Sequence, residues 1–315
     1  MNEQIDLLKK EISKAVIGQD SMIEGLLIGL LCDGHILVEG VPGLAKTTTI
    51  NALSRAIGLD SKRIQFTPDL LPSDIIGAQI YNPQNHSFSI KKGPLFTNLL
   101  LADEINRAPA KVQSALLEVM QERQVTIAEE TFKLERPFLV MATQNPIEQE
   151  GVYALPEAQL DRFMMKIVVQ HNSEIEELEI MRKAASKTFG EIEAVLNKED
   201  LFKLQEEINR VHIDHEIEHY IVQIITATRD PERFGLENLA QNIMFGASPR
   251  ASIDLYKAAK AKAFLRGNDF VSPADIGYVI HNILRHRIVL SYEARAKGVH
   301  TDEIISEIIE TLPIP

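Results

Sequence analysis

Short apolar runs alternate with helical patterns over about the first 172 residues of the chain. Behind the first run, Ile50, Leu53 and Ile57 recur on one helical face. Strands that alternate with helices are typical of an α/β domain built on a mostly parallel sheet. This part is therefore predicted to be an α/β domain with a five-stranded central sheet. Its candidate strands are residues 36–38, 64–66, 99–102, 138–142 and 164–169.

Beyond residue 172 the apolar β-runs fade and helical patterns dominate. Two of these patterns begin with Ser248-Pro249 and Ser272-Pro273. A serine can cap the free N–H groups of a helix, and proline is favoured at its first position. We therefore expect two domains, an α/β domain at 1–172 and a small all-α domain at 173–315. The predicted helices of the second domain are residues 174–185, 200–211, 216–228, 249–266 and 273–285.

Two segments of the first domain predict β-hairpins rather than crossover connections. Residues 78–92 have Asn82-Pro83-Gln84-Asn85 at their centre, and residues 124–137 turn around Glu129-Glu130. Asn, Pro and Gly are residues that favour turns between strands. We expect both hairpins to be insertions in the α/β domain.

A glycine-containing loop, Gly-Val-Pro-Gly-Leu-Ala-Lys-Thr at 40–47, follows the first strand and precedes a helix that Gly58 is predicted to end. In this position, backbone N–H groups of the loop and of the helix N-terminus point at phosphate oxygens. Lys46 is predicted to reach the β- and γ-phosphates, and the Thr47 hydroxyl to bind Mg²⁺. The residues predicted to hold the nucleotide here are Gly40, Pro42, Gly43, Leu44, Ala45, Lys46, Thr47 and Thr48.

Ala45 stands where the usual phosphate-loop pattern has glycine directly before the lysine. Alanine is disfavoured only at positive φ, so we expect the loop to keep αR or β geometry at this position.

The apolar run 99–102 ends in two adjacent carboxylates, Asp103 and Glu104. Because the carboxyl ends of parallel strands face the ligand crevice, both acids are expected near the phosphate loop. Asp103 is predicted to support Mg²⁺ from outside the ion's own ligand shell, and Glu104 to polarise the attacking water. The alternative is that this pair caps the helix that begins near Pro109.

The run 138–142 also ends in polar residues, Thr143-Gln144-Asn145-Pro146. The Asn145 amide could hold the water or the γ-phosphate at the same edge of the sheet. A simple turn before proline is the alternative.

Composition narrows the class of protein. Of 315 residues, 45% are apolar and 25% charged, which is typical of a globular protein. The net charge of -12 argues against binding nucleic acid through a basic surface. The single Cys32 excludes an internal disulfide and a thiolate zinc cluster, which fits a reducing compartment. No apolar stretch is long enough to span a bilayer and the amino terminus lacks a signal-peptide pattern, so we expect a cytoplasmic protein.

Five motifs occur in a fixed order along nearly the whole chain. They are Gly-Val-Pro-Gly-Leu-Ala-Lys-Thr, Leu-Leu-Ala-Asp-Glu-Ile-Asn-Arg-Ala, Ala-Thr-Gln-Asn-Pro, Leu-Pro-Glu-Ala-Gln-Leu-Asp-Arg-Phe and Gly-Ala-Ser-Pro-Arg-Ala. This combination resembles the MoxR family of AAA+ ATPases, which often lacks the glycine directly before the loop lysine. The resemblance implies an AAA+ P-loop domain with the hairpins as the helix-2 insert and the pre-sensor-1 hairpin. A helical lid domain would follow.

The resemblance also implies roles for residues outside the loop. Matching motif positions make Asn145 sensor 1, Arg162 the arginine finger and Arg250 sensor 2, and place Ile17 and Gly18 near the adenine base. A finger that acts on a neighbouring subunit implies a ring, which we expect to be a hexamer. An ion pair with Asp161 is the alternative for Arg162. Arg250 stands in the first turn of its helix, where a cation opposes the macrodipole unless an anion is bound there.

The function implied is a Mg²⁺-dependent ATPase that binds ATP and ADP and remodels or matures a protein partner. In this family the partner often has a von Willebrand factor A domain, and the process resembles chaperone-like assembly or metal insertion. The alternatives are the ATPase subunit of a metal chelatase, a nucleic-acid motor or clamp-loading ATPase, and a nucleotide-gated binding module. The predicted hairpin turns, 82–86 and 128–130, carry neither a basic cluster nor stacked aromatic rings, which argues against nucleic acid.

Overall fold

The computed structural model describes residues 3–84, 86–146, 151–186 and 188–315. A central sheet has the strand order β2-β5-β8-β1-β9, and all of its neighbouring strands are parallel. Its strands are β1 (Ile36–Glu39), β2 (Ser61–Gln65), β5 (Leu99–Asp103), β8 (Leu139–Gln144) and β9 (Met165–Val168). The five predicted strands and their parallel arrangement are confirmed, with ends shifted by a few residues.

Helices cover both faces of this sheet because successive side chains of a strand point to opposite faces. In β5, Leu99 and Leu101 belong to one buried apolar cluster, and Leu100 and Ala102 belong to a second. The helices of this part are α1 (Glu3–Ile12), α2 (Asp20–Leu31), α3 (Lys46–Ile57), α4 (Pro72–Ile76), the 3₁₀ turn η1 (Ile105–Arg107), α5 (Ala110–Glu122) and α6 (Glu157–Leu160).

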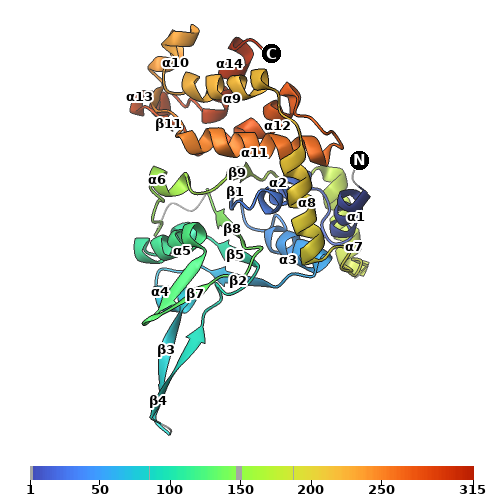
Figure 1. Cartoon of the computed structure of the whole chain (residues 1–315), viewed down its shortest axis with the longest axis vertical. Coiled ribbons are helices and arrows are strands. Elements are labelled where there is room, and N and C mark those ends of the chain that lie inside the picture. Colours follow the sequence, from blue (N-terminus) through green and yellow to red (C-terminus); the bar gives the residue numbers. More distant parts are fainter. Residues whose placement is uncertain (1–2, 85, 147–150, 187) are drawn as a thin grey trace.

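Both predicted hairpins are confirmed. The first pairs β3 (Gly77–Asn82) with β4 (Ser87–Lys92), and the second pairs β6 (Gln124–Ile127) with β7 (Glu130–Lys133). The first hairpin projects from the body of the molecule as a long arm (Figure 1). Asn85, predicted at its turn, lies outside the described residues.

The arm carries aromatic side chains near its end, which corrects one expectation from the sequence. Tyr81 lies opposite Phe88 in the neighbouring strand, with ring centroids 5.1 Å apart, and the Tyr81 hydroxyl lies 2.8 Å from Nδ1 of His86. The sequence analysis considered the turn alone, whereas cross-strand register brings two strand residues onto one face. Residues 78–90 nevertheless contain no Lys or Arg, the side chains that neutralise the charge of a nucleic-acid backbone.

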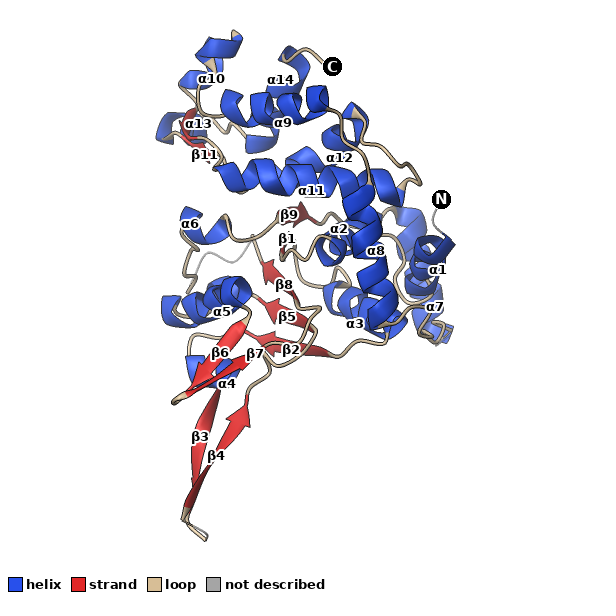
Figure 2. Cartoon of the chain, viewed as in Figure 1, coloured by secondary structure: helices blue, strands red, loops and turns tan. Residues whose placement is uncertain are grey.

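The remaining part is mostly helical, and all five predicted helices are confirmed. Figure 2 shows α9, α11 and α12 gathered at one end of the molecule, and α7 apart from them at the level of the central sheet. The small sheet β10–β11 departs from the predicted all-α composition because strands of two or three residues show no periodicity in the sequence. The elements are α7 (Glu174–Ser186), α8 (Lys198–Arg210), α9 (His215–Ala227), η2 (Glu232–Phe234), α10 (Glu237–Ala240), β10 (Ile243–Phe245), α11 (Pro249–Leu265), α12 (Pro273–Leu284), β11 (Val289–Leu290), α13 (Tyr292–Ala296) and α14 (Thr301–Thr311).

Ser248 and Ser272 stand at the N-cap positions of α11 and α12, as predicted. The Ser248 side chain accepts a hydrogen bond from the Arg250 N–H, and Ser272 donates its N–H and its hydroxyl to Asp275. These contacts fix where the two long helices of the lid begin.

The two parts of the chain share one apolar cluster through α2. Leu26 and Leu27 of α2 belong to the same buried cluster as Leu204 of α8 and Leu255 of α11. The domain boundary at residue 172 therefore remains a prediction. Within the part of the chain that the structure describes, no helix has the length and apolarity needed to cross a membrane.

Candidate functional site

The predicted phosphate loop lies between β1 and α3 at the carboxyl edge of the sheet. A Cβ at Gly40 would lie 3.1 Å from Val169, so this glycine lets the loop pack closely against the sheet. Gly43 has a φ of +90°, and nothing lies within 4 Å of the position that its Cβ would take. The loop is anchored at its start and open at Gly43, and the first N–H groups of α3 have no partner within the helix. This geometry suits close approach of a phosphate.

Lys46, the first residue of α3, points back across the loop. Its Nζ donates a hydrogen bond to the Gly40 carbonyl at 2.8 Å. Burial lowers the pKa of Lys46, while the negative charges of Asp103 and Glu104 oppose that shift. The structure thus brings the lysine and both predicted carboxylates together at one edge of the sheet.

Ala45 has φ 54° and ψ 18°, which is the left-handed conformation. The expectation that the loop would avoid positive φ here is therefore wrong. The loop must reverse direction directly before α3 begins, and the left-handed conformation makes that turn. A side chain in this conformation costs about 1 kcal/mol relative to glycine.

Asp103 is held by Arg63, which the sequence analysis did not identify, and by Thr143, to which it gave no role. Its Oδ2 accepts hydrogen bonds from Arg63 Nε at 3.1 Å and Nη2 at 2.7 Å, and its Oδ1 accepts one from the Thr143 hydroxyl at 2.6 Å. Arg63 lies on β2, and Thr143 lies near the end of β8. Both strands are neighbours of β5, so the order of strands in the sheet would have been enough to place Arg63 and Thr143 beside Asp103.

Hydrogen bonds hold both the backbone and the side-chain carboxylate of Glu104. Its backbone N–H donates to the Thr143 hydroxyl at 2.8 Å, and its Oε2 accepts hydrogen bonds from Gln65 at 2.7 Å and from Arg107 at 3.1 Å. Its φ is 56°, and its side chain makes no cap contact with η1. The residue that precedes α5 is Pro109, so the alternative that Asp103 and Glu104 cap this helix is not supported.

The donor set at this edge fits a magnesium ion. Mg²⁺ prefers oxygen ligands and retains several waters when it binds protein. Thr47 supplies a hydroxyl beside Lys46, and Asp103 supplies a carboxylate whose two oxygens are already engaged by Thr143 and Arg63. Asp103 is therefore better placed to support the ion from outside its ligand shell, as the sequence predicts.

Asn145 lies directly beyond the end of β8, at the same edge. Gln144 pairs with Glu39 at the end of β1, and its carbonyl accepts a hydrogen bond from the Gly40 N–H at 3.2 Å. Asn145 is buried. Its position next to the start of the phosphate loop fits contact with a terminal phosphate or a water.

The segment predicted to lie near the adenine base is tied to the chain that follows β9. Asn172 donates to the Ile17 carbonyl at 2.9 Å, and the Gln19 amide donates to Asn172 Oδ1 at 2.6 Å. Gly18 has a φ of +69°, and its Cβ would lie 2.7 Å from both Asn172 and Glu176. The positive φ therefore favours glycine at this position. Asn172 is a further site residue that no sequence motif indicated.

Arg162 and Arg250 lie at the opposite edge of the sheet from Lys46. Arg162 comes shortly before Met165, which pairs with Ile36 at the start of β1, and it donates to the Leu117 carbonyl at 2.9 Å. The four residues of β1, about 13 Å at ~3.3 Å each, separate this edge from the phosphate loop. Together with Asp161, the two arginines line a pocket of about 260 Å³. The structure does not bring them together with the phosphate loop of the same chain.

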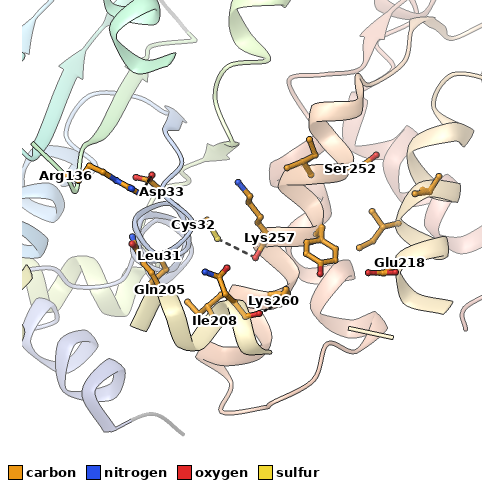
Figure 3. Close-up of a pocket in the computed structure, with 15 residues that line it drawn as sticks. Leu31, Cys32, Asp33, Arg136, Gln205, Ile208, Glu218, Ser252, Lys257 and Lys260 are labelled. Atoms are coloured by element: carbon orange, nitrogen blue, oxygen red, sulfur yellow. Dashed lines mark hydrogen bonds and ion pairs between the residues drawn. The ribbon is translucent and has the colours of Figure 1, made fainter. Parts of the chain in front are cut away.

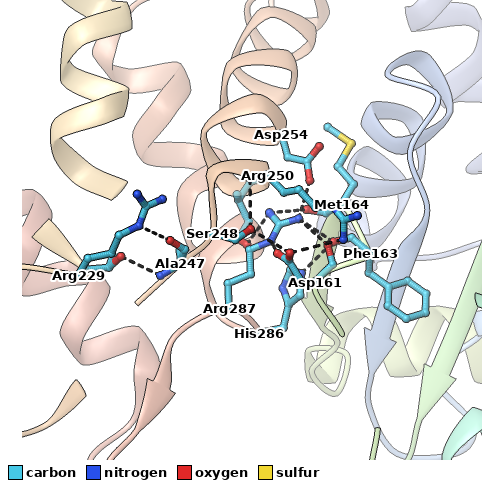
Figure 4. A network of polar contacts seen from close by, with 12 residues as sticks. Asp161, Phe163, Met164, Arg229, Ala247, Ser248, Arg250, Asp254, His286 and Arg287 are labelled. Atoms are coloured by element: carbon cyan, nitrogen blue, oxygen red, sulfur yellow. Dashed lines mark hydrogen bonds and ion pairs between the residues drawn. The ribbon is translucent and has the colours of Figure 1, made fainter. Parts of the chain in front are cut away.

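Asp161 is the centre of a network of polar contacts at this edge (Figure 4). Its carboxylate accepts hydrogen bonds from Arg287 Nε and the Ser248 hydroxyl, both at 2.9 Å, and lies 3.7 Å from Arg250. A carboxylate of the same chain thus offsets the unfavourable place of Arg250 at a helix N-terminus. The expectation that this place by itself indicates a bound anion is not upheld.

Comparisons with known proteins agree with this geometry. A model of the ATPase family associated with various cellular activities (AAA) matches residues 35–165, and a model of the AAA lid domain matches residues 237–308. Chaperone MoxR1 of Mycobacterium tuberculosis is 48% identical over 97% of this chain and 81% of its own length. Protein MoxR of Methylorubrum extorquens is 31% identical over 98% of this chain and 94% of its own. A crystal structure of a candidate ATPase from Cytophaga hutchinsonii is 52% identical, with a TM-score of 0.94 over 99% of this chain and 95% of that one.

Proposed function

The chain belongs to the MoxR family of AAA+ ATPases and is an ATP hydrolase, and from this premise we propose that it works as a homo-oligomeric ring that remodels or matures a protein partner. We expect six subunits. The proposal includes a partner with a von Willebrand factor A domain and a chaperone-like role in assembly or metal insertion.

Each residue at the carboxyl edge has a separate role in phosphoryl transfer. Lys46 and the N–H groups of the loop bind the β- and γ-phosphates. Glu104 orients and polarises the attacking water, and Asn145 holds that water or the γ-phosphate. When bound through Thr47, Mg²⁺ neutralises charge on the phosphate oxygens. Gln65 and Arg107 hold the Glu104 carboxylate in place through their hydrogen bonds to Oε2.

One observation supports the ring above all others. Lys46, Asp103 and Glu104 converge at one edge of the sheet, while Arg162 and Arg250 lie at the other. A guanidinium near the γ-phosphate contributes about 10³ to 10⁵ in rate when a second protein supplies it. Arginines that cannot reach their own nucleotide can reach that of a neighbour in a head-to-tail assembly, and such contacts form a ring when the rotation closes.

The site assignment is tested by two substitutions in the full chain. Lys46→Ala should abolish ATP binding, and Glu104→Gln should bind ATP normally but lose turnover. Binding is measured by calorimetry and turnover by phosphate release. The matched controls are Lys111→Ala and Glu122→Gln on the exposed side of α5, which should change neither quantity. Normal ATP affinity in Lys46→Ala, or normal turnover in Glu104→Gln, would contradict the assignment.

The partner class is tested with the same protein. Glu104→Gln loaded with ATP should retain the protein partner that the active ring releases, and mass spectrometry of the retained proteins identifies it. Stimulation of ATP turnover by single-stranded DNA, with binding that weakens steeply as salt rises, would instead favour the nucleic-acid motor.

A further inference from the structure

Helix α7 has no buried residue and exposes an apolar stripe. Ile175 is 81% exposed, Leu178 42% and Met181 59%. These residues lie on successive turns of the helix, on the side away from the partly buried Glu176, Ile180 and Lys183. A helix of 13 residues is only marginally stable in water without packing. The stripe is therefore expected to have a packing partner.

The stripe is acidic along one border and starts at the nucleotide edge. At about 100° per residue, Glu174 and Glu177 fall beside Leu178 and Met181, and the exposed Arg182 falls between Ile175 and Leu178. The helix follows β9, where the Val169 N–H donates to the Glu39 carbonyl at 2.8 Å, directly before the phosphate loop. The stripe therefore belongs to the side of the subunit that binds the nucleotide.

A groove of about 710 Å³ lies between the end of α2 and the helices α8, α9 and α11. Figure 3 shows the α2 residues on one side of it and the α11 residues on the other. Val222 and Ile253 in its lining are 53% and 54% exposed. Apolar side chains line most of it, and three cationic and two acidic side chains stand among them. The acids are Asp33, which forms an ion pair with Arg136, and Glu218. The apolar residues are Leu31, Ile208, Ile221, Val222, Ile253 and Tyr256, and the cations are Arg136, Lys257 and Lys260.

The groove belongs to the arginine side of the subunit. Asp33 and Ile253 line both this groove and the pocket that contains Arg162 and Arg250. Asp33 also precedes β1, at the edge of the sheet opposite the phosphate loop. The stripe and the groove thus lie on the two sides that a head-to-tail contact brings together.

We propose that α7 of one subunit docks in this groove of the next subunit. Ile175, Leu178 and Met181 fill the apolar part, and Glu174 and Glu177 lie near Lys257 and Lys260. This is the helix-in-groove mode of recognition, in which apolar residues on successive turns anchor the helix. The docking rests on the ring of the proposed function. The docking also connects the nucleotide site of one subunit to the groove of the next. The connection runs through α7, which begins beside Asn172, and Asn172 holds the Ile17 segment.

The first test measures assembly of the full chain with a non-hydrolysable ATP analogue and Mg²⁺ by analytical ultracentrifugation. Leu178→Asp and Val222→Asp should each weaken assembly about tenfold or more, because each places a charge in a desolvated apolar contact. Ile314→Asp, at a similarly exposed apolar position near the carboxyl terminus, is the matched control and should leave assembly unchanged. Thermal unfolding should be unaffected in all three, because the three side chains are exposed.

The second test measures charge pairing and proximity. Glu177→Lys and Lys257→Glu should each weaken assembly, and the double variant should recover most of it. In a Cys32→Ser background, mixing Leu178→Cys protein with Val222→Cys protein should give a disulfide-linked dimer that depends on the ATP analogue. Such a bond forms only when the Cα atoms come within about 7 Å.

The outcomes separate this proposal from the ring itself. If the unmodified chain assembles but stripe and groove variants assemble equally well and no cross-link forms, the docking is wrong and the ring stands. If the unmodified chain does not assemble, the ring fails and the docking fails with it. If stripe variants lose only the retained protein partner while assembly is intact, the stripe binds that partner and the proposed docking is overturned.

Discussion

At the scale of single residues, three segments of the candidate site each hold a residue in a backbone conformation that disfavours side chains. Gln19, Ala45 and Glu104 all have positive φ, at 61°, 54° and 56°. Such conformations cost of order 1 kcal/mol each and persist where the surrounding structure imposes them. They place one residue in each of three site segments, which are the base segment, the phosphate loop and the catalytic carboxylate. These three conformations lower the conformational stability of the backbone at positions where the nucleotide is predicted to bind.

Replacing Ala45 by glycine should therefore stabilise the protein. Glycine adopts this conformation without the steric cost of a Cβ, so the free energy of unfolding should rise by up to about 1 kcal/mol. Urea denaturation measures the change. Ala52→Gly, in the middle of α3, is the matched control and should lower the same quantity by about 1 kcal/mol or more. A loss of stability in Ala45→Gly would show that the left-handed conformation is wrong.

A buried histidine should make the stability depend on pH. His35 accepts a hydrogen bond from the Val140 N–H at Nδ1, and its Nε2 lies 3.0 Å from the Met120 carbonyl. Burial, followed by the charge of Arg123, lowers the pKa of His35 to about 4. The folded pKa lies below the unfolded value of about 6.5, so this stability is fully present above pH 6.5. It is lost as the pH falls towards 4, by about 3 kcal/mol in total.

The comparison of two histidine variants tests this dependence. Urea denaturation at pH 7 and pH 5 should show a smaller difference in His35→Gln than in the unmodified chain. His215→Gln changes a side chain that is 90% exposed and should keep the full difference. An unchanged pH dependence in His35→Gln would assign the effect to other groups, such as buried His286, whose pKa burial also lowers.

At the scale of elements, one arginine joins the end of α12 to the start of β9. The Arg287 side chain is 1% exposed and forms ion pairs with Asp161 and Asp254. It also donates to the Phe163 carbonyl at 3.0 Å. Burial raises the pKa of Asp254, and the charge of Arg287 opposes this shift. The lid is thus fixed to the edge of the sheet that presents Arg162 and Arg250.

Removing this arginine should cost far more than removing an exposed one. Arg287→Met leaves two carboxylates without their buried cation, so the free energy of unfolding should fall by about 3–5 kcal/mol. Adding Asp254→Asn should recover part of the loss, because it removes one of those charges. Arg295→Met, an exposed position on α13, should change stability by less than about 1 kcal/mol. Equal effects of the two single variants would refute a supporting role for the network.

At the scale of the whole molecule, the two edges of the sheet have different tasks. One edge carries the phosphate loop and its carboxylates, and the other carries two arginines on a face supported by the lid. In the proposed ring, a subunit built in this way completes its own site only with a neighbour. If that ring forms, the assembly rather than the single chain is the catalytic unit.

Mixing inactive variants tests this division. Arg162→Ala and Glu104→Gln should each bind ATP and hydrolyse it poorly, with a loss of about 10³ or more for the arginine. In a mixed ring, some sites combine an intact Glu104 with an intact Arg162 from the neighbour, so phosphate release should recover in part. Lys46→Ala mixed with Glu104→Gln is the matched control, because both defects lie at the same edge and no site is restored. No recovery in a verified mixed ring would count against action between subunits.

The sequence predicted the parts that depend on local pattern. Strand order in the chain, helix starts at Ser248 and Ser272, and the loop with Lys46 all follow from periodicity and capping chemistry. It missed Arg63, Gln65 and Asn172, since these residues join the site only through strands and segments that are distant in sequence. It also misjudged Ala45, because a backbone conformation is imposed by the turn and is not written in the residue type.

By itself, then, the sequence determined which groups are candidates for the chemistry, because a phosphate loop, an apolar strand and its terminal acids are each specified by neighbouring residues. Only the tertiary structure decided where those groups meet. Sheet order placed Lys46, Asp103 and Glu104 at one edge, and the buried contacts of Arg287 and Asp161 held the arginines at the other. Such distances depend on how elements pack across the whole chain, which no local pattern contains.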